Sequence, residues 1–188
     1  MCSMQATTTI PSRQSTLIEV NVRWLRQALR LLDRLDDAAY STAPRGFAPH
    51  RAGAHLRHVL EFYQCFLTGL EISRIDYDAR RRDEAIECSR DAASAAIASI
   101  IRSFETCQEL REERMIRVRM EDAEASAVRD SFMESSISRE LQVLSSHTIH
   151  HFALIAMTLR MHNVEMDPDF GMAPSTLRYL ASKTVEAA

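Results

Sequence analysis

The sequence predicts an all-α protein that folds as a single up-and-down four-helix bundle. Its 188 residues include only four glycines and five prolines, and the prolines lie at the edges of long uninterrupted stretches. Within these stretches apolar residues recur at steps of three and four, which gives a helix one apolar face. Four such stretches with short or moderate connections favour a bundle in one domain.

The order of elements follows from the same periodicity. We expect residues 1–14 to be a disordered N-terminal segment and residues 15–183 to form the single domain. Four main helices are expected at 15–38, 50–72, 83–113 and 135–162, and a short terminal helix at 175–183. Residues 114–120 and, more weakly, 126–132 alternate in polarity, which is compatible with a small β-hairpin between the third and fourth helices. The connection at 75–83 reads as a self-neutralised charge cluster.

Composition excludes several classes of protein. A net charge of −3 and a pI near 6.2 argue against a nucleic-acid-binding protein, which is usually basic. Because the chain has no run of about 18 apolar residues and no charged start followed by an apolar block, we expect neither a membrane span nor a signal peptide. The four cysteines lack CxxC spacing, so we interpret them as reduced thiols of a cytoplasmic protein.

The strongest local signal for chemistry is a pair of histidines in the fourth expected helix. His147 and His151 are four residues apart, so their imidazole rings lie one turn apart on the same face and can converge on one metal ion. The pair lies within an apolar stripe that should face the core, formed by Ile137, Leu141, Leu144, Leu154, Ile155 and Thr158.

Two interpretations of this pair are open at this point. Buried imidazoles without partners cost about 1–3 kcal/mol per unsatisfied group, so either a metal or hydrogen bonds to neighbouring helices must satisfy them. In a bundle, a third ligand would come from a facing helix. The second expected helix offers His55 and His58 near its start.

Four separate blocks of the chain carry a recognisable pattern, namely residues 53–63 (GAHLRHVLEFY), 75–83 (IDYDARRRD), 135–151 (SSISRELQVLSSHTIHH) and 170–179 (FGMAPSTLRY). Together these blocks resemble the DinB/YfiT superfamily of four-helix-bundle proteins. The resemblance extends from about residue 15 to residue 180. It implies a DinB-like bundle with a divalent metal held by one histidine of the second helix and an HxxxH pair of the last.

Carried over to this chain, the resemblance assigns the metal ligands to His58, His147 and His151, with His55 as the alternative to His58. It places His150 on a neighbouring face or in a supporting role. Imidazole ligands favour a transition metal, with Zn, Ni or Fe expected first. Because a metal ligand must be deprotonated, we expect metal occupancy to fall as the pH drops through about 6–6.5, the range of an unperturbed histidine.

Three histidine ligands would leave open positions on the metal, which is typical of a reactive centre. Relatives in the superfamily include transferases and isomerases that use low-molecular-weight thiols. The resemblance therefore implies a metal-dependent transferase or hydrolase. It also implies a homodimer. The relatives also include the iron-binding domain of sulfoxide synthases that make thiohistidines. These carry an acid two residues beyond the second histidine, where this chain has Ala153. The alternative is a metal-binding or stress-related bundle without catalysis. Glu61 and Tyr63 are candidates for acid–base or supporting roles, or are buried structural residues.

Overall fold

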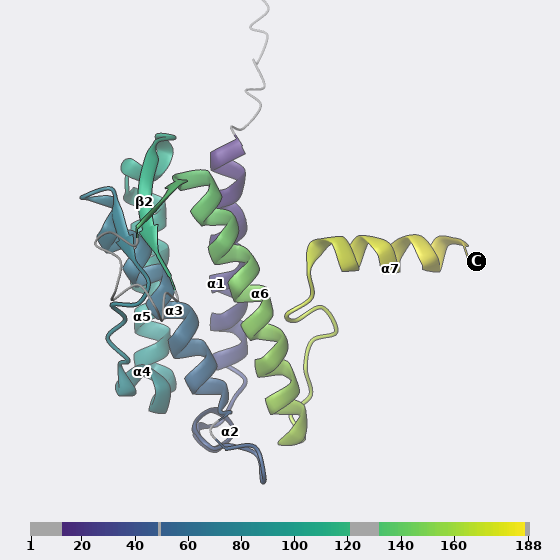
Figure 1. Cartoon of the computed structure of the whole chain (residues 1–188). Helices are drawn as coiled ribbons and strands as arrows, with labels where there is room; N and C mark the ends of the chain where they lie inside the picture. Colours follow the sequence, from purple (N-terminus) through teal and green to yellow (C-terminus); the bar gives the residue numbers. More distant parts are fainter. Residues whose placement is uncertain (1–12, 49, 121–131, 187–188) are drawn as a thin grey trace, which may run out of the picture.

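The computed structural model describes residues 13–48, 50–120 and 132–186 (Figure 1). It is mainly helical, as predicted, and carries a small sheet. The helices are α1 (Arg13–Leu32), α2 (Asp37–Ser41), α3 (Ala52–Leu70), α4 (Glu84–Cys88), α5 (Arg90–Thr106), α6 (Ile137–Met161) and α7 (Pro174–Glu186), with a 3-10 turn η1 at Glu109–Arg111. The strands are β1 (Arg74–Asp76), β2 (Met115–Arg119) and β3 (Met133–Ser136).

Two of the expected helices are divided. The first, expected at 15–38, ends at Leu32, and the short helix α2 follows a turn. The third, expected at 83–113, breaks at Ser89, whose backbone is extended and whose hydroxyl accepts a hydrogen bond from the Ala92 N–H to cap α5. The N-terminal segment expected at 1–14 falls mostly outside the described residues, although Arg13 and Gln14 already belong to α1.

The four long helices α1, α3, α5 and α6 pack around one hydrophobic core. α3 lies against both α6 and α5, and α1 also lies against both. The apolar stripe expected on α6 is confirmed: Ile137, Leu141, Leu144, Ile155 and Thr158 are buried, and Leu154 is half-buried. α7 projects away from this group in Figure 1.

The directions of the helices differ from the alternating up-and-down order that we expected. α3 and α5 run the same way: Glu87, just before α5, touches the start of α3 at Gly53, and Phe104 near the end of α5 packs on Tyr63 with ring centroids 5.6 Å apart. The reason is the segment between Leu70 and Asp83, which returns along α3, so that α5 starts at the same end as α3.

α1 and α6 also run parallel to each other and opposite to α3 and α5. The Trp24 Nε1–H donates a 2.9 Å hydrogen bond to Ser145 Oγ, one turn beyond the contact of Asn21 with the Leu141 carbonyl. In chain order, α1 therefore runs in one direction, α3 and α5 both run in the opposite direction, and α6 runs in the same direction as α1. The alternating order is wrong, whereas the helical class is confirmed.

The sheet contains the first strand expected before the last helix, as β2, and two strands at positions where we did not expect them. β2 pairs with β3 in antiparallel register, with Ile116 opposite Ser135. Of the second expected strand, residues 126–131 lie outside the described residues, and β3 follows at Met133. β1, in what we interpreted as a charged connection, pairs parallel to β2, and Ile75 is fully buried there.

No helix among the described residues is long and apolar enough to cross a membrane. Cys65, Cys88 and Cys107 are free thiols in this part of the chain.

Candidate metal centre

The structure brings His58, His147 and His151 together between α3 and α6. One ring nitrogen of each residue lies within 4.8 Å of those of the other two. The ring centroids are 4.9 Å apart for His58 and His147, 4.6 Å for His58 and His151, and 4.5 Å for His147 and His151. These are the three residues that the resemblance selected.

A buried polar network sets the face of α6 that meets α3. The Tyr63 hydroxyl lies 3.0 Å from Thr148 Oγ1 and donates to Asn21 Oδ1 at 2.8 Å, which links α3, α6 and α1. Thr148 in turn donates to the Leu144 carbonyl. Because Thr148 is the residue after His147, this network fixes the rotation of α6 at the cluster.

Phe62 supports two of the three imidazoles. Its ring stacks on that of His147 with centroids 4.1 Å apart and 29° between the planes. It also packs on His58 at 4.9 Å. The flat apolar contact restricts both rings and removes part of their surface from water, which favours their neutral form.

The environment keeps the cluster neutral over a wide pH range. Burial, followed by the nearby histidines and arginines, lowers the pKa of His58 and of His147 to about 4. The pKa of His151 is lowered furthest, to about 2, by burial and then by the other histidines. Neutral imidazoles offer the lone pairs that a metal ion needs, so protons should compete for this site only well below the range of pH 6–6.5 that we expected from unperturbed histidines.

The donor set fits a divalent transition metal. His147 Nε2 is buried and has no hydrogen-bond partner among the described residues, which is costly unless an ion or solvent engages it. Two imidazole nitrogens on one tetrahedral zinc ion lie about 3.4 Å apart, given bonds of about 2.0–2.1 Å. Nitrogens that already lie within 4.8 Å of one another reach this spacing through small ring rotations.

His55, the alternative ligand, lies beside the cluster but outside the three-histidine group. Its Nδ1 is 3.2 Å from Nδ1 of His151, and its ring stacks on His50 with centroids 5.6 Å apart. Burial is the main cause that lowers its pKa. His150 is exposed and meets the edge of the His151 ring at 5.1 Å, in keeping with a neighbouring face.

A hollow of about 290 Å³ opens beside the cluster and gives small molecules access to it. It is lined by His50, Arg51, Ala54, His55, Arg57, His58, Glu87 and His151. Sequence reasoning did not identify Glu87 or the two arginines, because α4 carries no motif that indicates its approach to α3.

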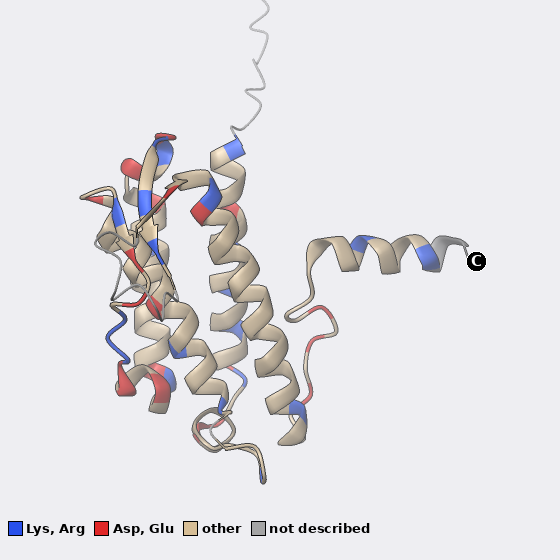
Figure 2. Cartoon of the chain, viewed as in Figure 1, with Lys and Arg blue, Asp and Glu red and all other residues tan. Residues whose placement is uncertain are grey.

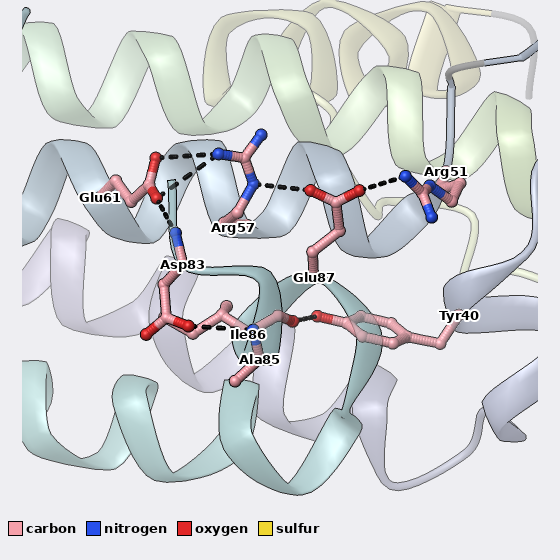
Figure 3. A network of polar contacts seen from close by, with 8 residues as sticks. All are labelled: Tyr40, Arg51, Arg57, Glu61, Asp83, Ala85, Ile86 and Glu87. Carbon is pink, nitrogen blue, oxygen red and sulfur yellow. Dashed lines mark hydrogen bonds and ion pairs between the residues drawn. The ribbon is translucent and has the colours of Figure 1, made fainter. Parts of the chain in front are cut away.

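The charged residues of the hollow form a connected network (Figure 3). Arg57 contacts Glu61 at 3.3 Å and Glu87 at 2.9 Å, and Glu87 also contacts Arg51 at 2.5 Å. Glu61 accepts a 2.7 Å hydrogen bond from the Asp83 N–H as well, so its carboxylate anchors the connection to α4. Of the two acid–base candidates, Glu61 is thus bound to Arg57, and Tyr63 belongs to the core, where burial raises its pKa.

Comparisons with known proteins do not assign this chain to a family. No family model matches it, and no solved structure matches it. FK506-binding protein 5 of Rhizopus delemar is 30% identical over 109 residues, which is 58% of this chain. The chain spans only 28% of the length of that protein, so the similarity concerns part of each chain.

Proposed function

We propose that this protein is a DinB-like four-helix bundle that binds one divalent transition metal through His58, His147 and His151. The observation that carries the proposal is the convergence of these three neutral imidazoles between α3 and α6, with the buried His147 Nε2 left without a partner among the described residues. Zn, Ni or Fe are the metals we expect, because imidazole nitrogens favour them over Mg or Ca.

We further propose that the centre is catalytic, as a thiol-dependent transferase or hydrolase. A metal with three protein ligands retains open positions, where it can polarise a substrate group or lower the pKa of a bound water or thiol. The hollow beside His58 and His151 offers a path to those positions. A low-molecular-weight thiol is the small-molecule partner that this proposal names.

Elemental analysis tests metal binding, and cobalt substitution tests the function. The purified protein should contain about one such metal per chain. After exchange for Co²⁺, addition of a small thiol such as 2-mercaptoethanol should change the visible spectrum, because a thiolate bound to Co²⁺ adds an intense charge-transfer band. If the spectrum of the Co²⁺-loaded protein does not change when a thiol is added, the second candidate is favoured, a bundle that binds a metal without thiol chemistry.

The remaining proposals concern assembly and location. We propose a homodimer, which light scattering would show as a species of about twice the 21.4 kDa chain mass. A single species at the chain mass across concentrations would contradict it. We also propose a cytoplasmic location, in which the free thiols of Cys65, Cys88 and Cys107 stay reduced.

A further inference from the structure

Arg80 holds a guanidinium group beside the three-histidine cluster. Its Cζ lies 4.8 Å from the centroid of the Phe62 ring, the ring that stacks on His147 and packs on His58. Its Nη1 donates a 2.5 Å hydrogen bond to the Tyr77 carbonyl. The side chain is half-buried, so these contacts hold its charge in place next to the cluster.

The charge of Arg80 has no carboxylate partner among the residues that the structure describes. Two acids of the same connection make other contacts: Asp76 forms an ion pair with Arg119, and the Asp83 carboxylate accepts the N–H of Ala85. Glu61 is paired with Arg57. Figure 2 shows the basic stretch in the connection that precedes the acidic α4.

The charge of Arg80 acts on the histidines of the cluster. The positive charge of Arg80 is one of the causes, after burial, that lower the pKa of His58 and His147. The same field must also oppose a divalent cation bound by these residues. A fixed cation beside a cation site is an electrostatic cost, and an anion bound between the two charges would remove it.

We propose that the metal centre takes a small anionic ligand, such as a thiolate or a carboxylate, and that Arg80 stabilises its negative charge at an open position of the metal. The three imidazoles are neutral and cancel none of the charge of the metal, so the centre and Arg80 together favour an anion over a neutral donor. The inference rests on the proposed metal site and names the class of ligand that this site selects.

Azide and imidazole provide a direct comparison, because both bind Co²⁺ but only azide is charged. Each is titrated into the Co²⁺-loaded protein while the visible spectrum is recorded. In Arg80→Gln the dissociation constant for azide should rise roughly three- to thirtyfold, as expected for the loss of one opposite charge at partly screened range. The dissociation constant for imidazole should stay equal or fall.

The same variant should bind the metal alone more tightly. Removal of the opposing charge should lower the dissociation constant for Co²⁺ by roughly three- to tenfold in a buffer without coordinating anions. A merely structural role for Arg80 predicts the opposite change, because damage to the site would weaken the binding of the metal and of both azide and imidazole.

Two variants serve as controls. Arg81→Gln removes the neighbouring, exposed arginine and should leave the dissociation constants of azide and imidazole unchanged. Arg80→Lys keeps the charge and should restore most of the preference for azide. Circular dichroism of each variant checks that the fold is intact.

The outcomes separate the two proposals. If the wild-type protein binds no Co²⁺, both the metal site and the role of Arg80 are wrong. If it binds Co²⁺ but Arg80→Gln and wild type bind azide equally, the metal site stands and the anion proposal is overturned. The anion proposal is also overturned if Arg80→Gln weakens the binding of azide and of imidazole to the same extent.

Discussion

His55 Nδ1 lies 3.2 Å from His151 Nδ1, across the interface between α3 and α6. Two neutral imidazoles at this distance share one proton, and either nitrogen can donate it. If His151 donates, its Nε2 keeps a lone pair for a metal. If His55 donates, the proton of His151 lies on Nε2, which then cannot bind a metal. Metal binding through Nε2 therefore requires His55 to accept, and His55 would orient His151 without being a ligand.

The first prediction tests this role of His55. His55→Ala should raise the dissociation constant for the metal by about 10- to 100-fold, the usual effect of losing a hydrogen-bond partner of a ligand, while the stoichiometry stays near one per chain. His55→Asn, whose side-chain oxygen can accept in place of Nδ1, should recover part of the affinity. Competition with a chromophoric chelator measures these constants.

The matched control is His150→Ala. His150 also meets the His151 ring, but edge to face at a centroid distance of 5.1 Å, so its removal should leave the affinity for the metal within about threefold of wild type. Equal affinities of wild type and His55→Ala would show that the 3.2 Å contact has no role in the metal site.

The second prediction concerns the ligands themselves. His58→Ala, His147→Ala and His151→Ala should each abolish stoichiometric metal, because two remaining imidazoles hold a divalent ion only weakly. Elemental analysis after dialysis against a weak chelator measures the metal content, and circular dichroism confirms the helix content. Normal metal content in His58→Ala, together with loss of the metal in His55→Ala, would show that His55 and not His58 is the third ligand.

The third prediction is a pH dependence of the metal-free protein. The pKa of His58 and of His147 is about 4 in the folded chain, whereas the unfolded chain has the ordinary value near 6.5. Between these pH values the unfolded state binds more protons, so the free energy of unfolding should fall as the pH drops from about 6.5 towards 4. Above 6.5 these residues contribute no pH dependence.

Urea unfolding at pH 5 and pH 7 in the presence of a chelator measures this effect. His147→Phe, which keeps a flat ring on Phe62, should lose less stability between the two pH values than wild type. Histidine ring signals in NMR spectra provide a second measurement, since His58 and His147 should titrate well below 6. Titration of both near 6.5 would contradict the prediction.

The fourth prediction concerns the close approach of α4 to α3 at Gly53. A Cβ atom there would lie 2.0 Å from the Glu87 carbonyl oxygen, a backbone atom that cannot rotate away. Alanine favours helices over glycine by up to about 1 kcal/mol, yet Gly53→Ala should destabilise the protein by about 1–3 kcal/mol because the helices must separate.

Urea unfolding also measures this change. Ala54→Gly, at the adjacent half-buried position, is the control and should cost only about 1 kcal/mol, the helix propensity difference. A Gly53→Ala protein that is more stable than wild type would show that α4 does not approach α3 as described. The variant should also disturb Glu87, and with it the charged wall of the hollow.

The sequence by itself determined the helical class and the pair on α6. Apolar spacing of three and four residues is a local property, and so is the placement of His147 and His151 on one face of a helix. Local alternation of polarity also indicated β2, whereas β3 lies beyond the second strand that we expected. The choice of His58 came from the resemblance, because His55 and His58 are only three residues apart and periodicity alone does not separate them.

Only the tertiary structure decided the direction of the helices and the surroundings of the site. The parallel course of α3 and α5 depends on how residues 71–83 return along α3, and β1 forms because β2 is there to pair with it. The same connection brings Arg80 onto the Phe62 ring beside the cluster, and it places α4 so that Glu87 lines the hollow. Contacts between segments far apart in the chain leave no periodic signal, so the electrostatics of the site emerges only when the fold brings them together.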